Sequence, residues 1–400
     1  MILAFDLRED PAAFHNPTNR DILCSLFPGT TGVGRLGMFL RFVLQELPRK
    51  PWPKTVAGLP IYFALELSPE DSPFPLGTGV SRRNGSIAEN LDCRNARPWG
   101  RLFSIIQYHF EAIKVPITEV MYWDTYVLIV LEDRTTQWDK LPQKVAKVTC
   151  TYMYEDQMAR PRSFPSRQLT EPSPGVPDEN EYDTLQPGIR ITSDYQPGQQ
   201  GAFRATTTGV LLSDEVGNRF MTAAAHGFPP ECGLSVLHPS PNGRVIGELV
   251  MEVSYTDVAL VSLEHGERFE NVTFENEIVS AIQLRRLIRE EENYTGGIVF
   301  IDSPDTGCLE GTFGFTSYQN IPSDSLSPKR RWAFTKWVYR GQDHSSSHLP
   351  PDGICGSAMW TEQGDVLGFF RYAIDGGPFK DWCVGIASEE LLDRGYMLAS

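Results

Sequence analysis

The 400-residue chain lacks any long hydrophobic run, and this absence narrows the class of protein. No apolar stretch approaches the roughly 18–20 residues that a membrane-spanning helix needs. The first residues, MILAFDLREDPAAF, also lack the basic segment and apolar core that are typical of a secretory signal. We therefore expect a cytoplasmic protein with no membrane partner.

Positive charge is scarce. The chain has 36 Lys and Arg against 51 Asp and Glu, so its formal net charge is −15. Binding to phosphate groups requires clustered Lys and Arg side chains. The one compact basic run, Lys329-Arg330-Arg331, is typical of a solvated turn. We therefore expect no nucleic-acid partner.

Closely paired cysteines are also absent. Seven cysteines are scattered along the chain without a CxxC pair. An odd number of cysteines without a signal segment indicates reduced thiols and argues against a disulfide framework or a zinc finger. His344 and His348 have i,i+4 spacing, but they lie in a Ser-rich segment without a third ligand. We expect neither a metal nor another cofactor.

Proline and glycine, by contrast, are abundant, with 30 and 34 residues. Seven of the prolines lie between residues 160 and 200, in a polar stretch without apolar periodicity. Such a composition predicts an extended or disordered linker, which we place at residues 159–200. The linker would separate an N-terminal domain, residues 1–158, from a C-terminal domain, residues 201–400.

The N-terminal part shows a mixed pattern of apolar residues. Helical spacing at residues 35–47 and 102–113 predicts two helices, and residues 58–67 resemble a strand. Two further strands are predicted at 117–122 and 125–131. These elements indicate a small α/β domain of unknown role, through which a regulatory partner could bind.

The C-terminal part consists of many short segments rich in β-branched and aromatic residues, separated by turn residues. This pattern predicts an antiparallel barrel or sandwich. The charged segment 284–293 would connect two barrels, at about 201–282 and 294–388, and a short helix would follow at about 388–395. The predicted fold class is thus α+β and multidomain, with a mainly β C-terminal domain.

Three motifs in this C-terminal part contain residues suited to catalysis. The first is FMTAAAHG, which ends an apolar strand with His226. The second is YTDVALV, in which Asp257 opens a strand, and the third is GICGSA, in which a glycine-framed turn carries Cys355. Each motif alone is more typical of an ordinary structural residue, but their order and shared β context favour a catalytic set.

These motifs resemble those of the chymotrypsin/trypsin-like double β-barrel peptidases (the PA clan), which include viral chymotrypsin-like cysteine proteases. The family motif T-A-A-H is similar to residues 222–226 with one extra alanine, and D-I-A-L is similar to residues 257–260. The G-x-S-G nucleophile turn is similar to residues 353–356, with cysteine in place of serine. The resemblance covers about residues 201–398 and does not reach the N-terminal part.

The resemblance implies a role for each residue. Cys355 would be the nucleophile, His226 its base and Asp257 the residue that orients the imidazole. The backbone N–H groups of Gly353 and Cys355 would form the oxyanion hole. Ile354 stands where the family often has an aspartate, which argues against activation through a newly formed N-terminus.

The resemblance also implies that the strand after the nucleophile binds substrate. That strand contains Gly368, Phe369, Phe370, Arg371 and Tyr372. Arg371 would favour an acidic P1 residue if its side chain points inward, but a strand alternates faces and an outward arginine is an equal alternative.

Two questions remain open on the sequence: which residue is the nucleophile and what the protein does. Ser357 is a second candidate for the nucleophile. The leading functional hypothesis is a cytoplasmic cysteine endopeptidase that cleaves protein or peptide substrates. The alternative hypothesis is an inactive pseudo-peptidase that serves as a protein-binding or scaffold module, and a viral-type processing protease is a third.

Overall fold

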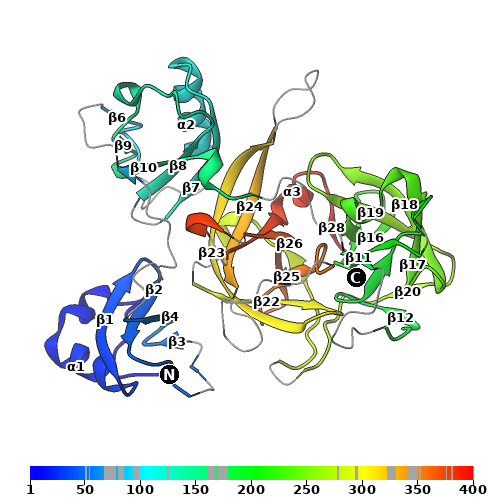
Figure 1. Ribbon diagram of the computed structural model, residues 1–400, viewed down its shortest axis with the longest axis horizontal. Helices are drawn as coiled ribbons and strands as arrows, with labels where there is room; N and C mark the ends of the chain where they lie inside the picture. Colours follow the sequence, from blue (N-terminus) through cyan, green and yellow to red (C-terminus); the bar gives the residue numbers. More distant parts are fainter. Residues whose placement is uncertain are drawn as a thin grey trace.

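The computed structural model consists mostly of β-strands, with three α-helices among the residues it describes (Figure 1). It describes residues 1–49, 52–53, 55–66, 78–79, 85–92, 99–123, 126–160, 167–169, 179–199, 201–276, 279–292, 296–321, 330–339, 350, 353–374, 376–379 and 382–399. Within these ranges, no helix has both the length and the apolar character needed to cross a membrane.

A four-stranded sheet lies near the N-terminus. It contains β1 (Thr30–Leu36), β2 (Phe39–Leu44), β3 (Thr55–Val56) and β4 (Leu59–Leu65), and α1 (Pro17–Ser25) contacts β1. The strand predicted for residues 58–67 is confirmed by β4. The helix predicted for residues 35–47 is wrong, because β1 and β2 form an antiparallel hairpin there. Leu40, Phe42 and Leu44 are all buried, and this repeat of two residues is the period of a strand.

A second unit, the α2 unit, follows. It contains β5 (Thr78–Gly79), β6 (Ser86–Ile87), α2 (Trp99–Ala112), β7 (Ile117–Tyr122), β8 (Tyr126–Leu131), β9 (Lys144–Val145) and β10 (Val148–Tyr154). The predicted helix at 102–113 and the predicted strand at 117–122 are confirmed by α2 and β7. Helix α2 buries Phe103, Ile106 and Phe110 in one apolar cluster with strands of this unit. Residues 1–158 thus contribute to two different sheets.

Strands from the C-terminal part form a closed ring, the second barrel. Its members are β22 (Ile298–Ser303), β23 (Gly307–Ile321), β24 (Arg330–Tyr339), β25 (Ala358–Trp360), β26 (Asp365–Ala373) and β27 (Trp382–Ala387). The ring closes because β22 pairs with both β25 and β23. Strand β23 also pairs with β7, so that the sheet of the α2 unit continues into this barrel (Figure 1).

Most of the remaining strands form a nine-stranded sheet, the first barrel. In spatial order they are β11 (Arg167–Leu169), β14 (Phe203–Thr207), β13 (Arg190–Thr192), β17 (Ser235–His238), β18 (Arg244–Val253), β19 (Val258–Leu263), β16 (Arg219–Ala224), β15 (Leu211–Ser213) and β28 (Met397–Leu398). A pair of short strands, β12 (Thr184–Leu185) and β20 (Arg268–Phe269), accompanies them. Strand β28 brings the C-terminal end of the chain back to this barrel.

The predicted linker ends earlier than residue 200. Strands β11, β12 and β13 all lie within residues 159–200. Strand β11 pairs with β14, and β13 pairs with both β14 and β17. Leu185, Ile189 and Ile191 are fully or almost fully buried in the core of the first barrel. The proline content predicted an extended chain, but it did not reveal that apolar residues between the prolines have a core to fill. Residues 184–192 therefore belong to the first barrel.

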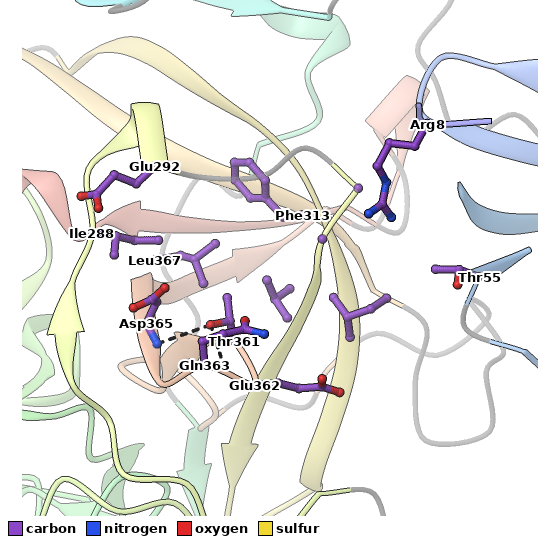
Figure 2. Close-up of a pocket in the computed structure, with 14 residues that line it drawn as sticks. Arg8, Thr55, Ile288, Glu292, Phe313, Thr361, Glu362, Gln363, Asp365 and Leu367 are labelled. Carbon is purple, nitrogen blue, oxygen red and sulfur yellow. Dashed lines mark hydrogen bonds between the residues drawn. The ribbon is translucent and has the colours of Figure 1, made fainter. Parts of the chain in front are cut away.

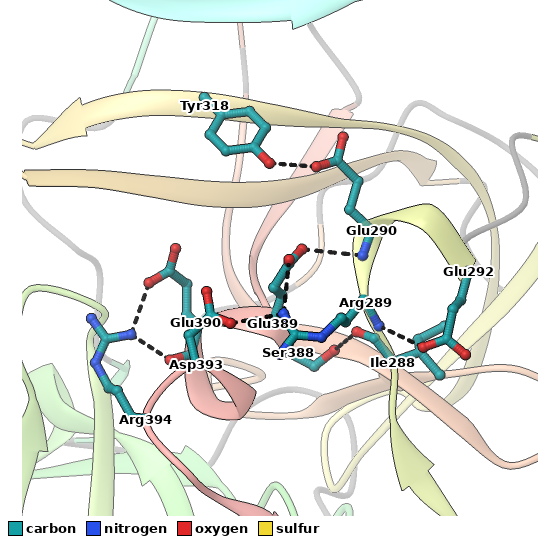
Figure 3. Close-up of polar contacts among 10 residues, drawn as sticks. All are labelled: Ile288, Arg289, Glu290, Glu292, Tyr318, Ser388, Glu389, Glu390, Asp393 and Arg394. Atoms are coloured by element: carbon teal, nitrogen blue, oxygen red, sulfur yellow. Dashed lines mark hydrogen bonds and ion pairs between the residues drawn. The ribbon is translucent and has the colours of Figure 1, made fainter. Parts of the chain in front are cut away.

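The charged segment between the barrels is held by polar contacts (Figure 3). It contains β21 (Arg286–Leu287), which pairs with β26, and a short 3-10 turn at Glu290–Glu292. Arg289 forms ion pairs with Glu389 and Asp393, at 3.2 and 2.7 Å, around the short helix α3 (Glu389–Leu392). The hydroxyl of Tyr318 on β23 donates to Glu290 at 2.5 Å. These contacts fix the connection and α3 to the second barrel.

Candidate active site

His226 and Asp257 form a hydrogen-bonded pair at the end of two neighbouring strands. His226 lies in the turn that follows β16, and Asp257 directly precedes β19. The two strands are antiparallel with Ala224 opposite Val258, which brings both residues to the same edge. The His226 imidazole Nδ1 lies 2.5 Å from Asp257 Oδ2, and the His226 backbone N–H donates to Oδ1 at 2.9 Å. The carboxylate therefore binds His226 twice, once at the imidazole ring and once at the backbone.

The backbone around Asp257 is unusual. Asp257 has a φ of 61°, a left-handed conformation that costs most residues free energy. Its N–H donates to the Glu252 carboxylate at 3.1 Å, and the Thr256 hydroxyl donates to the Val253 carbonyl at 2.6 Å. The pKa of Glu252 is raised, first by desolvation of its carboxyl and then by the nearby charge of Asp257. Glu252 was not predicted as a site residue from the sequence.

The turn that carries Cys355 depends on two glycines. Gly353 and Gly356 have φ values of 101° and 91°. A Cβ on Gly356 would lie 2.6 Å from the Thr207 carbonyl oxygen and 2.8 Å from the Ala224 nitrogen, so no other residue fits there without a shift. The chain therefore requires glycine at Gly356 for both space and conformation.

Thr207 attaches this turn to the first barrel. Its backbone N–H donates to the Cys355 carbonyl at 3.0 Å, and its hydroxyl donates to the Gly353 carbonyl at 2.8 Å. Thr207 ends β14, whereas the turn leads into β25 of the second barrel. Cys355 also packs in one apolar cluster with Ala224, two residues before His226. The turn thus lies between the barrels, beside the strand that leads to His226.

Cys355 is almost completely buried, with 3% of its surface exposed. Its thiol Sγ lies 3.1 Å from the backbone carbonyl oxygen of Arg371 and donates to it. Ser357 is fully buried, and its hydroxyl donates to the Ile354 carbonyl at 2.7 Å. The Ser357 hydroxyl therefore supports the turn, which weakens its candidacy as the nucleophile.

Arg371 points toward Asp257. Its Nε lies 3.9 Å from Asp257 Oδ2, which is within ion-pair range but too long for a direct hydrogen bond. The guanidinium also lies over the ring of Phe334, 5.9 Å from its centroid. Only 10% of the Arg371 side chain is exposed. This placement removes the basis for assigning Arg371 to recognition of an acidic P1 residue.

The other predicted substrate-binding residues are buried on β26. Gly368 has no room for a side chain, since a Cβ would lie 2.2 Å from the Ile386 carbonyl oxygen. Phe369, Phe370 and Tyr372 are 3–5% exposed and fill the core. Strand pairing between β25 and β26 runs from Val366 to Phe369. The backbone from Arg371 onward therefore lies beyond that pairing, next to the Cys355 thiol.

Two further features lie away from this cluster. A cavity of about 360 Å³ is lined by Arg8 and Thr55 on one side and by second-barrel residues such as Phe313 and Leu367 on the other (Figure 2). It includes none of the three candidate catalytic residues. The segment with His344 and His348 falls outside the described residues, and the described part of the chain contains no group of three His, Cys, Asp or Glu placed to hold a metal.

Three contacts of the site were not foreseen from the sequence. Thr207 binds the nucleophile turn, Glu252 binds Asp257, and Arg371 contacts both Asp257 and Cys355. Thr207 is far from Gly353 along the chain, and Arg371 is far from Asp257, so no local pattern marks these two contacts. Glu252 is five residues before Asp257, so the hairpin between β18 and β19 was the available signal.

Comparison with known proteins gives matches only among solved structures. No family model and no curated protein matches the chain. The chain is similar to a glutamic acid-specific serine protease that uses a histidine triad in substrate binding, with 13% identity, a TM-score of 0.39, and coverage of 54% of this chain and 100% of that chain.

Two other similar structures are also proteases. The Nocardiopsis protease is 14% identical, with a TM-score of 0.37 and coverage of 54% of this chain and 100% of that chain. Chymotrypsin from Cellulomonas bogoriensis is 14% identical, with a TM-score of 0.36 and coverage of 55% and 99%. Because these identities and TM-scores are low, the assignments below rest on the geometry of this chain.

Proposed function

We propose that this chain is a cysteine endopeptidase with His226 as the general base and Cys355 as the nucleophile. The observation that carries the proposal is the His226–Asp257 pair, held at 2.5 Å beside a glycine-framed turn that presents a cysteine. A carboxylate that binds Nδ1 leaves Nε2 as the nitrogen that can exchange a proton with a nucleophile. An imidazole oriented in this way is the base that thiol activation requires.

The proposed reaction has two stages. In the first, His226 takes the thiol proton and the Cys355 sulfur attacks the scissile carbonyl carbon, forming a C–S bond and an oxyanion. The oxyanion is bound by the N–H groups of Gly353 and Cys355. His226 then protonates the amine as the C–N bond breaks. In the second stage His226 deprotonates water, which attacks the thioester and releases the acid and the thiol.

The proposed substrate is a protein or peptide. An extended peptide can bind a strand edge through its backbone. The carbonyl of Arg371 faces the Cys355 thiol just beyond the pairing of β25 with β26. We therefore assign substrate-backbone binding to this end of β26, rather than to the buried side chains of Phe369 and Phe370.

One observation favours the alternative function, a pseudo-peptidase that binds proteins without cleaving them. The Cys355 thiol is 3% exposed and already donates to a backbone carbonyl. A buried thiol in apolar surroundings is usually inert. The two functions therefore make opposite predictions for the reactivity of this one sulfur atom.

Alkylation of the full chain at neutral pH distinguishes the two functions. We expect Cys355 to react with iodoacetamide faster than Cys24, which is an exposed free cysteine and serves as the internal reference. His226→Ala should slow labelling of Cys355 without changing that of Cys24. It should also lower peptide hydrolysis by about 100-fold or more, and Cys355→Ala should abolish it.

The opposite pattern would reject the peptidase. If Cys355 reacts no faster than Cys24, and His226→Ala changes neither rate, the thiol is not activated. Ser357→Ala separates the two candidate nucleophiles. If this variant loses hydrolysis while Cys355 is labelled at the normal rate, the Ser357 hydroxyl is the nucleophile.

A further inference from the structure

Arg371 contacts two members of the candidate catalytic set through different atoms, and the inference drawn from it rests on the proposed peptidase function. Its backbone carbonyl accepts the Cys355 thiol at 3.1 Å. Its side-chain Nε lies 3.9 Å from the Asp257 carboxylate. Strand β26 therefore brings a positive charge into the region where a thiolate would form.

The charged and titratable groups around the nucleophile come from three places in the fold. His226 follows β16, whereas Glu252 and Asp257 lie in and after β18. Arg371 and Tyr372 belong to β26. Burial above all raises the pKa of Tyr372 to about 12, so that its hydroxyl is neutral near neutral pH. Two carboxylates thus share this region with one guanidinium and one imidazole.

This distribution of charge opposes ionisation of the nucleophile unless a cation offsets it. A thiolate at Cys355 would add a third negative charge to the region that holds Asp257 and Glu252. Like charges in a partly desolvated site disfavour one another, and a nearby opposite charge favours the ionised form. Arg371 is the cation that the described residues place in ion-pair range of Asp257.

A packing role alone does not account for this arginine. Burial lowers the pKa of Arg371, and the charges of the Asp257 and Glu252 carboxylates act in the opposite direction. An arginine nevertheless stays protonated at neutral pH. Burying a charged side chain costs free energy that an apolar residue of similar size would not. The charge must therefore be offset by its electrostatic partners.

We propose that Arg371 is a positioning residue that holds the Asp257 carboxylate through its side chain and stabilises the Cys355 thiolate through its charge. Through Asp257 it also fixes the orientation of the His226 imidazole. Its role is therefore regulation of the nucleophile's ionisation, and it makes no contact with substrate through its guanidinium.

The test is the pH profile of Cys355 alkylation in the full chain. Iodoacetamide labelling of Cys355 and of the reference Cys24 is measured from acidic to alkaline pH in the wild type and in Arg371→Met. The inflection for Cys355 should rise by about 1 pH unit or more in Arg371→Met, while that of Cys24 stays unchanged. Arg371→Lys keeps the positive charge, so the inflection for Cys355 should rise less in this variant than in Arg371→Met.

A matched variant separates charge from packing. Phe334→Leu removes the ring beneath the guanidinium but keeps the arginine, and it should leave the inflection unchanged. If Arg371→Met does not fold, Arg371→Gln supplies a second neutral side chain for the same measurement.

The outcomes distinguish this inference from the function on which it rests. An activated Cys355 in the wild type, with the same inflection in Arg371→Met or Arg371→Gln, overturns the role of Arg371 and leaves the peptidase standing. A shift in Phe334→Leu as large as that in Arg371→Met would also overturn it, because packing would then be the cause. A wild-type Cys355 no more reactive than Cys24, with neither rate changed by His226→Ala, rejects the peptidase itself.

Discussion

Two clusters in this protein bury charged side chains, and they do so in different ways. The junction cluster joins the α2 unit to the second barrel and consists of Glu119 on β7, Lys336 on β24 and Arg160. Glu119 and Lys336 have 0 and 2% of their side chains exposed, and Arg160 has 13%. The carboxylate lies 2.9 Å from Lys336 and 2.7 Å from Arg160. Each charge therefore has a partner at hydrogen-bond distance.

The charged groups are less closely paired in the site cluster, which consists of His226, Asp257 and Arg371. Each of these side chains is 10 or 11% exposed. Asp257 lies 2.5 Å from His226 but 3.9 Å from Arg371. A cation held at this longer distance still acts through its field, while the imidazole keeps a nitrogen for proton transfer.

This difference in charge pairing shows how buried charges can serve either structure or reactivity. Burial alone would raise the pKa of Glu119, but the charges of Lys336 and Arg160 outweigh it and hold the pKa below its usual value. Such closely matched partners stabilise one ionisation state, as a structural joint requires. At the proposed active site, the charges are less closely paired, and this allows the thiol to change its ionisation state.

The largest effect on stability is expected for the junction cluster. Glu119→Ala leaves Lys336 and Arg160 buried without their central carboxylate. We expect the free energy of unfolding to fall by about 3–5 kcal/mol, measured by denaturant titration. Asp156→Ala, which breaks the exposed pair with Arg134 in the same unit, is the control and should have little effect. Equal losses in the two variants would contradict the prediction.

An intermediate effect should appear in the pH dependence of the same cluster. Burial lowers the pKa of Lys336 from 10.5 to about 8, with the charge of Glu119 opposing. Between about pH 8 and pH 10, the unfolded chain binds more protons at this position than the folded chain, so stability rises with pH. Relative to Lys336→Met, the wild type should gain about 1 kcal/mol per pH unit in this window.

The matched variant is needed because burial raises the pKa of several tyrosines, which therefore begin to ionise near the upper end of that window in the unfolded chain but not in the folded one. Unfolding free energies of the wild type and Lys336→Met are measured at each pH, and their difference removes contributions that both proteins share. A difference that stays constant from pH 8 to pH 10 would show that Lys336 remains charged throughout, contrary to expectation.

The smallest effect is expected for Glu252, which tests the electrostatics of the site cluster. Its pKa is raised by desolvation first, so the ionised form is disfavoured in the folded protein, and stability is lost as pH rises through its titration. Glu252→Gln keeps an acceptor for the Asp257 N–H. It should raise the melting temperature at neutral pH by about 1 °C, and the gain should vanish at acidic pH. A gain that is independent of pH would exclude this electrostatic cause.

Local patterns predicted the parts of the fold in which neighbours along the chain decide the structure. The apolar face of residues 102–113 predicted a helix, and α2 forms there. The pattern failed at residues 35–47, where apolar residues are frequent enough to match either period. There the hairpin formed because Phe42 of β2 can pack against Phe27 and Phe63, contacts that a local pattern does not contain.

The sequence by itself determined which residues are chemically suited to a site. The order of His226, Asp257 and Cys355, and the glycines that frame the cysteine, are local features that can be read without a structure. Tertiary structure alone decided that Thr207 anchors the nucleophile turn and that Arg371 faces Asp257. Motifs depend on neighbouring residues and their backbone conformation, whereas charge balance depends on distances between segments that meet only after folding.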